Sequence, residues 1–486
     1  MRLKSLYIRD YKILQDFSID FTSNLSVLIG ENGSGKSSII ECLAYIFGHL
    51  HKYFVLDDKT AEFIDGYKIN YTINGLDVYI ESHYKESKSN TFDPIIKVNG
   101  DEMSTSQLKK RYGDLSFLPS RVIISYSGIT ERLALLSEHY EQKFIQKIIR
   151  QNNPYSLKPL VLPEDNPFVY IKKDYVAFII LALFVLNTDE ANHLLALLGI
   201  DINGCTTTIT LKKPRWAKNS KEENKQDMIW GMSGKIAQDL LTGLNLLAIH
   251  KKDEQDKGQN RLQYELYGLN MVQDLFGEYY ELTPSKVVLF LNTLLCDDIL
   301  DSIDITWGPS FSIDNLSEGE KQMILSIGLS LVLNQSNLLF LLDEPDVSLH
   351  PKWQQDLITN FTAGLNEESM AVITTHSPSL ASDLSGKNLT LIRKGRVVTK
   401  SFKYYGKKID DILYDYFGLE STRNKDVSRR IEELWNMIQA NTYNSNEFIT
   451  LKEELSTIIG NDDSEIMAMN RDILPRTSAS ATMRRA

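Results

Sequence analysis

The chain has 486 residues, of which 42% are hydrophobic and 24% are charged, and its formal net charge is −11. This length is enough for two or three lobes with buried cores, and the composition excludes wholesale disorder. The acidic balance argues against a uniformly basic nucleic-acid-binding surface, although a local basic groove is compatible with it.

Cysteine usage and hydropathy indicate the compartment. Cys42, Cys205 and Cys296 lie far apart without CxxC spacing, which is typical of free thiols in a reducing cytosol. The first twelve residues carry too many charges for a signal peptide. The longest apolar run, residues 175–186, is shorter than the roughly 18 residues that a membrane span needs, so we expect a buried helix there. We therefore predict a cytoplasmic protein with no membrane partner.

In chain order, the first predicted elements are two strands over residues 3–21, a strand over 25–30 and an amphipathic helix from residue 36. The strand at 25–30 is apolar on both faces, which suits a sheet covered on both sides. Further short strands follow, the last near residue 126. These elements predict a first lobe over residues 1–130.

The remaining chain divides by pattern into four parts. Residues 131–309 are mainly helical in pattern, with two islands of strand, and we expect this insert to serve dimerisation or partner binding. Residues 310–402 alternate strand and helix as a second lobe, and residues 403–470 are helical. Residues 471–486 are predicted to be a disordered tail. The predicted fold class is therefore α/β, with two lobes, a helical insert and a helical C-terminal region.

A complete P-loop pattern, Gly30-x4-Gly35-Lys36-Ser37, lies between the apolar strand and the helix. Its glycines let backbone N–H groups converge on phosphates, and the helix N-terminus adds partial positive charge. Lys36 is expected to reach the β- and γ-phosphates of ATP, and Ser37 to ligate Mg²⁺. A glycine-rich turn that matches by chance is the alternative, and the strand-to-helix context argues against it. The predicted nucleotide-binding residues are Gly30, Glu31, Asn32, Gly33, Ser34, Gly35, Lys36, Ser37 and Ser38.

Two later apolar strands end in residues suited to phosphoryl transfer. Asp343 can hold Mg²⁺ at the first strand end, and Glu344 can orient or deprotonate the attacking water. His376, at the second strand end, can hydrogen-bond the γ-phosphate. An ordinary acidic turn and a satisfied polar histidine are the alternatives. We predict that Glu344 and His376 are catalytic, and that Ser37 and Asp343 hold the metal.

The stretch NLSEGEKQMIL, residues 315–325, has the form of a second anion-binding helix N-terminus. Ser317-x-x-Glu320 is a capping box, which many helices carry without binding any ligand. Gly319 in the first turn costs about 1 kcal/mol relative to alanine. Its presence is easier to explain if another group approaches the backbone closely.

Taken in order, GENGSGKSS, LSEGEKQ, LLFLLDEPDVSLHP and TTHSP resemble the ATPase core of the ABC superfamily, and within it the RecF, SMC and OLD branch. The resemblance covers roughly residues 1–130 and 310–400. It implies a two-lobed ATPase head with mixed and parallel sheets, and a head-to-tail homodimer or higher even oligomer that closes on ATP. The signature of one chain would then contact the ATP held by Lys36 and Ser37 of the other, through Leu316, Ser317, Glu318, Gly319 and Glu320.

Some features depart from that family. His350 stands where the family's D-loop usually ends in Asp, and residues 125–128 are a Q-loop candidate by order only. Tyr11 and Lys12 are candidates for the adenine contact. No sustained heptads predict a coiled coil, and the acidic turn at 461–465 lacks the preceding strand of a Toprim nuclease. We therefore expect no nuclease activity from this chain alone.

The C-terminal pattern at 409–438 is similar to ATPase subunits of bacterial anti-phage defence systems, above all the Septu ATPase PtuA, which is also found beside retrons. The PARIS ATPase is a near alternative. The resemblance implies an ATPase that senses infection, through DNA or a phage-derived trigger, and controls a separate effector nuclease of HNH type. Two other functions stay open: a RecF-type DNA-repair ATPase, for which residues 212–218 (KKPRWAK) are a candidate DNA contact, and a non-hydrolysing nucleotide-binding scaffold.

Overall fold

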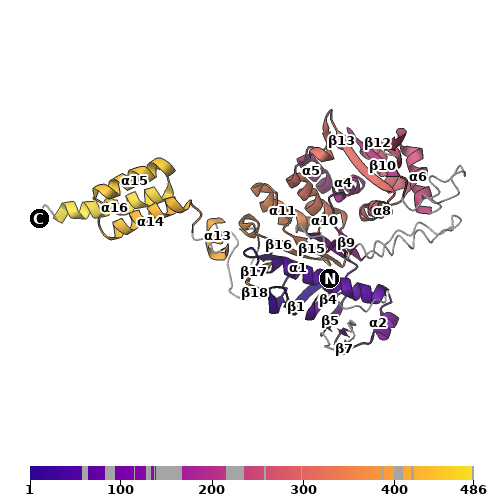
Figure 1. The fold of residues 1–486 in the computed structure, drawn as a ribbon, viewed down its shortest axis with the longest axis horizontal. Helices are drawn as coiled ribbons and strands as arrows, with labels where there is room; N and C mark the ends of the chain where they lie inside the picture. Colours follow the sequence, from indigo (N-terminus) through magenta and orange to yellow (C-terminus); the bar gives the residue numbers. More distant parts are fainter. Residues whose placement is uncertain are drawn as a thin grey trace. The chain divides into compact units, whose positions relative to one another are not determined.

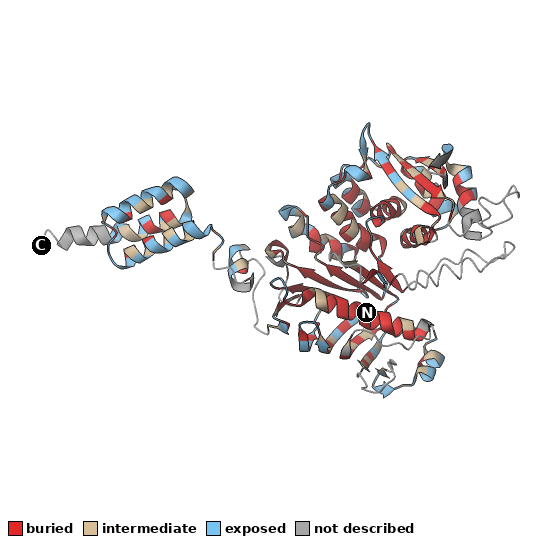
Figure 2. Ribbon diagram, in the orientation of Figure 1, coloured by how far each residue is buried: buried red, intermediate tan, exposed pale blue. Residues whose placement is uncertain are grey.

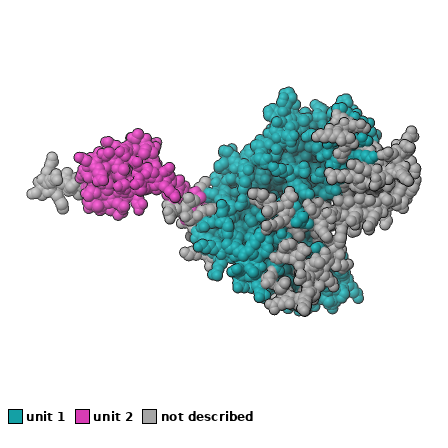
Figure 3. Space-filling view, viewed as in Figure 1, with its two compact units in different colours: residues 1–407 teal, residues 408–486 magenta. Residues whose placement is uncertain are grey.

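The computed structural model divides into two compact units, residues 1–407 and 408–486 (Figure 3), which are described separately. The residues that it describes are 1–56, 64–82, 94–113, 115–126, 133–135, 137, 167–214, 235–256, 259–296, 298–382, 384, 388–398, 409–417 and 421–483.

The first sheet of the larger unit is antiparallel, with the strand order β2-β1-β4-β5-β6-β7. Alternating buried and exposed side chains along β1 and β2 give it one covered face. Its strands are β1 (Arg2–Tyr11), β2 (Leu14–Asp20), β4 (Asp65–Ile73), β5 (Leu76–Ser82), β6 (Ile95–Val98) and β7 (Asp101–Glu102), and helix α2 (Thr105–Arg111) follows.

The second sheet carries the predicted site residues at its strand ends. Its order is β18-β17-β3-β16-β15-β8-β9, and all neighbours are parallel except β17 and β18. Every residue of β3, β15 and β16 is buried, as their continuous apolar runs predict for strands covered on both faces. The strands are β3 (Leu25–Ile29), β8 (Arg121–Tyr126), β9 (Phe168–Tyr170), β15 (Leu338–Asp343), β16 (Met370–Thr375), β17 (Leu389–Arg393) and β18 (Arg396–Val397).

Helix α1 (Lys36–Leu56) lies between these two sheets and is buried along most of its described length (Figures 1 and 2). Its side chains share one apolar core with β1, β4, β5, β15 and β16. Helix α11 (Pro351–Gly364) packs on β15, where the rings of Phe340 and Phe361 meet at 5.6 Å between centroids. Because α1 is enclosed, its N-terminal turn is held firmly at the end of β3.

The insert contains more strand than its sequence pattern predicts. Residues 131–309 are expected to be mainly helical with two islands of strand. Their described part instead contributes β10, β11, β12 and β13 to a third, antiparallel sheet with the order β11-β12-β10-β13-β14, and β9 joins the second sheet. Strand β11 is charged along its length, so its pairing with β12 is not signalled by apolar alternation. The strands are β10 (Cys205–Lys212), β11 (His250–Asp256), β12 (Gln259–Tyr267), β13 (Leu300–Trp307) and β14 (Phe311–Ser312).

The apolar run at 175–186 forms helix α4 (Tyr175–Leu186), which is buried at ten of its residues. No helix in the described part of the chain combines the length and apolarity needed to cross a membrane. The other helices of this region are α5 (Asp189–Leu197), α6 (Lys235–Leu247), α7 (Gly268–Val272), the π-helix η3 (Gln273–Tyr279) and α8 (Pro284–Cys296).

The NLSEGEKQMIL stretch begins a helix that packs on α4. A 3-10 turn, η4 (Ile313–Asn315), leads into α9 (Glu318–Met323), a π-helical turn η5 (Ile324–Gly328) and α10 (Leu329–Val332). A Cβ at Gly328 would lie 2.8 Å from Ile179 Cγ2 of α4. The absence of a side chain at Gly328 therefore lets the signature helix approach the insert.

The smaller unit is helical, with α13 (Ile409–Phe417), α14 (Lys425–Gln439), α15 (Asn446–Ile459) and α16 (Ser464–Met483). Leu434, Ile438, Phe448, Leu455 and Met469 belong to its core. The acidic segment at 461–465 runs into the first turn of α16, and its Asp463 accepts two hydrogen bonds from the Arg423 guanidinium, at 2.8 and 3.0 Å. The sequence predicts a disordered tail over residues 471–486, whereas α16 continues to Met483.

Candidate active site

The P-loop is shaped by close backbone contacts. Gly30 follows β3 with φ +154°, and a Cβ there would lie 2.1 Å from the carbonyl oxygen of Ile392. The neighbouring hairpin of β17 and β18 also donates a hydrogen bond from Gly395 N to Ser34 O at 2.9 Å. A side chain at Gly30 would therefore displace the β17–β18 hairpin, which contacts the P-loop backbone.

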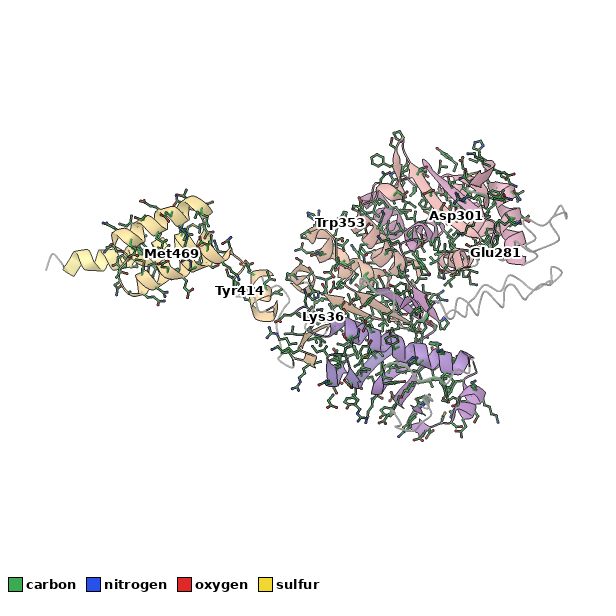
Figure 4. The ribbon with its side chains drawn as sticks, in the orientation of Figure 1. Lys36, Glu281, Asp301, Trp353, Tyr414 and Met469 are labelled. Carbon is green, nitrogen blue, oxygen red and sulfur yellow. The ribbon has the colours of Figure 1, made fainter. Side chains whose placement is uncertain are left out.

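Lys36 opens α1 beside the second sheet (Figure 4) and is buried. Its Nζ donates to the carbonyl oxygens of Gly30 and Glu31, at 3.0 and 3.1 Å. Glu31, Asn32 and Gly33 are exposed at the rim, whereas Ser34 and Gly35 are buried and Ser37 and Ser38 are half-buried. The lysine thus lies on the backbone of its own loop, close to where phosphates would be cradled.

Ser37 and Asp343, which are 306 residues apart, meet at the ends of α1 and β15. Ser37 Oγ donates to Asp343 Oδ1 at 2.9 Å, and Thr374 Oγ1 donates to the same oxygen at 2.5 Å. Burial raises the pKa of Asp343, although these two hydrogen bonds oppose the shift. A hydroxyl and a buried carboxylate are the hard oxygen ligands that Mg²⁺ prefers, so these residues fit the predicted metal.

Glu344 and His376 form a second pair beside Lys36. His376 Nε2 lies 2.8 Å from Glu344 Oε1, and Lys36 Nζ lies 3.4 Å from His376 Nδ1. Burial, and then the charge of Lys36, lower the pKa of His376, which favours the neutral ring. A neutral ring that donates from Nε2 to Glu344 presents Nδ1 as an acceptor to Lys36.

The backbone also holds Glu344 in place. Its φ is +51°, which is uncommon for a residue with a side chain, and its N–H donates to Thr374 O and Thr374 Oγ1 at 3.1 and 3.0 Å. Burial lowers the pKa of Lys36 to about 8, against the opposing charges of Glu344 and Asp343. The predicted catalytic and metal-binding residues therefore converge on one edge of the second sheet.

The signature residues are arranged differently. Ser317 Oγ accepts from Glu320 N at 3.3 Å, and Glu320 Oε2 accepts from Ser317 N at 2.7 Å, so the predicted capping box is formed. Leu316 is buried and Glu318 is exposed. A Cβ at Gly319 would lie 2.6 Å from the carbonyl oxygen of Ser348. The close approach expected at Gly319 is therefore made by the chain's own backbone.

The adenine and Q-loop candidates converge on Glu41, a buried carboxylate of α1 that the sequence patterns did not single out. Tyr11 and Tyr126 donate to it at 2.9 and 3.1 Å, and Lys12 forms an ion pair with it. Residues 127 and 128 of the Q-loop candidate lie outside the described part of the chain. A glutamate at the sixth position of a helix carries no motif of its own, so only the fold identifies this cluster.

Two other predictions have plain structural outcomes. His350 N-caps α11, where its Nδ1 accepts from Lys352 N at 3.3 Å, and Pro351 follows at the first helical position. Lys212 of the candidate DNA contact forms ion pairs with Asp298 and Asp301, at 3.0 and 3.4 Å. Residues 215–218 of that candidate lie outside the described residues.

Comparison with known proteins adds a family and relatives. Residues 1–381 match the model of the AAA ATPase domain family. The chain is 21% identical over 499 residues to the retron Ec83 probable ATPase of Escherichia coli, covering 98% of this chain and 87% of the relative. It is 22% identical to the retron Vc95 probable ATPase of Vibrio cholerae, covering 85% and 78%. It is also 26% identical over 171 residues to the DNA replication and repair protein RecF of Desulfitobacterium hafniense, covering 32% and 44%.

Proposed function

This chain belongs to the AAA ATPase domain family, and we propose that it is the ATP-hydrolysing subunit of an anti-phage defence system. ATP would close it into a head-to-tail homodimer, and the nucleotide state would control a separate effector nuclease. The observation that carries the proposal is the convergence of Lys36, Ser37, Asp343, Glu344 and His376 on one sheet edge.

This constellation suits ATP hydrolysis. Bound ATP would supply the phosphoryl group to be transferred, and the Mg²⁺ held by Ser37 and Asp343 would neutralise part of the charge on that group. Lys36 would turn from the Gly30 and Glu31 carbonyls toward the phosphates, which are stronger acceptors for its charge. Glu344 would orient the attacking water and accept its proton, and the neutral His376 would donate to the γ-phosphate.

The signature supports the dimer. The hydrogen bonds of Ser317 lie within its own helix turn, and Gly319 packs on Ser348 of the same chain. Ser317 and Glu318 are nevertheless exposed at a helix N-terminus, where the helix dipole favours an anion. A second chain, with ATP in its P-loop, could supply that anion, so that each composite site forms twice in a two-fold dimer.

The defence assignment draws on the relatives. The retron Ec83 and Vc95 probable ATPases align with most of this chain, and the Ec83 alignment covers 98% of it, so it includes most of the helical C-terminal unit. An effector of HNH type is the partner that a Septu-like subunit would have, and the helical unit at 408–486 is the candidate for holding it. The RecF relative favours a second candidate, a DNA-repair ATPase that binds DNA when ATP is present, although it aligns with only 32% of the chain.

A pull-down of the tagged Glu344→Gln chain from its own host, with ATP present, tests these two functions. This substitution keeps the shape of the side chain but removes the base, so the ATP-closed state should accumulate. We expect a nuclease in stoichiometric amount. Recovery of DNA and repair proteins alone would support the RecF-type function instead. The matched control is the double variant with Lys36→Met, which should not bind ATP and should lose any ATP-dependent partner.

A further inference from the structure

A closed ring of hydrogen bonds joins the loop of His376 to the turn that follows Glu344. Thr375 Oγ1 donates to Asp346 Oδ2 at 2.7 Å, and Ser377 N donates to Thr375 Oγ1 at 2.8 Å. Ser377 Oγ in turn donates to Gln354 Oε1 at 2.8 Å. The side-chain nitrogen of Gln354 closes the ring by donating to the carbonyls of Asp346 and Leu349, both at 3.2 Å.

Gln354 contributes to this ring from both ends of its amide. The amide oxygen holds the His376 loop, and the amide nitrogen holds both ends of the turn at 346–349. Gln354 itself lies on α11, eight residues beyond Asp346 and outside every motif of the sequence. Because α11 packs on β15 through Phe361 and Phe340, the amide is presented from a fixed helix.

The turn needs support because its backbone is unfavourable. Ser348 has φ +73° and Glu344 has φ +51°, so two residues with side chains adopt the left-handed region within five positions. Such conformations persist where the surroundings fix them. Asp346 is also buried, and its Oδ1 has no hydrogen-bond partner among the residues that the structure describes, so its own side chain gives only part of this support.

The turn at 346–349 also contacts the signature helix. The Ser348 carbonyl fills the space beside Gly319, at 2.6 Å from where a Cβ would be. The chain of contacts therefore runs from the His376 loop through Ser377 and Gln354 to Leu349, whose chain neighbour Ser348 contacts Gly319. It links the side of the site that faces this chain's nucleotide to the side that would face the partner's nucleotide.

We propose that Gln354 is a positioning residue, which couples the His376 loop to the signature by holding the turn at 346–349. This inference rests on the proposed function for the role of the signature. Gln354 would act on turnover through the turn and would leave the P-loop unchanged. Its removal should consequently lower kcat while the affinity of the isolated chain for ATP stays the same.

The test compares Gln354→Leu, which keeps the side-chain volume, with Gln355→Leu on the exposed face of the same helix. Hydrogen exchange in the nucleotide-free chain should become at least tenfold faster at the Val347 and Leu349 amides in Gln354→Leu. The kcat of ATP hydrolysis should fall about tenfold, and the Kd for ATP should change less than twofold. Gln355→Leu should match the wild type in all three measurements.

A second variant, Ser377→Ala, removes the other end of the ring and leaves the two bonds from Gln354 to the turn in place. It should lower kcat less than Gln354→Leu, and the double variant should be no slower than Gln354→Leu alone, because both act through one path. Additive losses of kcat in the double variant would overturn the inference. So would an unchanged exchange rate of the Val347 and Leu349 amides in Gln354→Leu, or a faster exchange that leaves kcat unchanged. If the wild type shows no ATP-dependent association, the proposed function fails, while the exchange comparison still decides whether Gln354 holds the turn.

Discussion

The P-loop and the signature both lie at helix N-termini, where the helix dipole favours an anion, but their polar groups are satisfied in different ways. In the P-loop, Lys36 is buried and lies on the carbonyls of Gly30 and Glu31, which are weaker partners than phosphate. In the signature, Ser317 and Glu320 satisfy each other in a capping box. Phosphate oxygens would therefore be stronger partners for Lys36 than the carbonyls it contacts, whereas Ser317 and Glu320 already satisfy each other as the start of a helix.

Glycine also serves opposite purposes in the two places. Gly30 and Gly35 adopt positive φ, so they shape a loop that residues with side chains would distort. Gly319 is helical, and it makes room for Ser348 of the same chain. We therefore expect similar motifs to act on different steps: the P-loop on nucleotide binding, and the signature on turnover of the bound nucleotide. Variants at the two sites should separate these steps.

The largest effect is expected from Lys36→Met, which removes the charge that would meet the phosphates. We expect at least a hundredfold loss of ATP affinity, or about 2.7 kcal/mol, by calorimetric titration. Lys352→Met on the exposed first turn of α11 is the matched control and should bind ATP as the wild type does. Equal affinities in the two variants would show that the P-loop does not hold the nucleotide.

Gly319→Ala should act on turnover and leave binding intact. The new Cβ would meet the Ser348 carbonyl at 2.6 Å, so either the turn or the helix must shift. We expect a loss of about 1–3 kcal/mol in the free energy of unfolding, together with a lower kcat and an unchanged Kd for ATP. Gly277→Ala, whose Cβ would have an ordinary 3.7 Å contact with Val185, is the control. A loss of ATP affinity in Gly319→Ala would contradict the separation of steps.

The P-loop and the signature also differ in how far the sequence alone predicts their surroundings. The P-loop follows from local information, since an apolar strand, a glycine pattern and a helix occur within some thirty residues. The meeting of Ser37 with Asp343 also follows, because Ser37 lies in the first turn of the helix that comes after β3, Asp343 ends β15, and both strands are parallel strands of one sheet. The fold class predicted from these patterns is confirmed, and so is the ATPase family.

The remaining features depend on contacts between distant residues. The need for glycine at position 319 is visible in the sequence, but the group that approaches it, Ser348 O, is not. Gln354 has no motif, and its importance appears only when α11 is placed beside the turn at 346–349. Likewise, β11 is a run of charged residues that becomes a strand by pairing with β12. In each case the local structure depends on a contact with another segment, which the spacing of residues in the sequence does not reveal.

A smaller effect on the P-loop should appear as pH dependence. Burial lowers the pKa of Lys36 to about 8 in the free chain, and bound phosphates should raise it. Below pH 8 the lysine is already charged and ATP affinity should be flat. Above pH 8 binding must take up a proton, so affinity should fall by up to about tenfold per pH unit. Lys36→Arg, which stays charged throughout, should remove this slope in titrations from pH 7 to pH 9.5.

The smallest effect, on the signature, separates its capping role from ligand binding. Ser317→Ala removes the side-chain acceptor for Glu320 N and should reduce the free energy of unfolding by about 1 kcal/mol. Ser317→Thr keeps both the hydroxyl and the cap, so its stability should lie close to that of the wild type. If the hydroxyl also contacts a phosphate bound by the partner, the kcat of Ser317→Ala should be well below that of Ser317→Thr at temperatures where both variants are folded. Equal kcat values would mean that Ser317 only begins its helix, and the composite site would then depend on the backbone around Gly319.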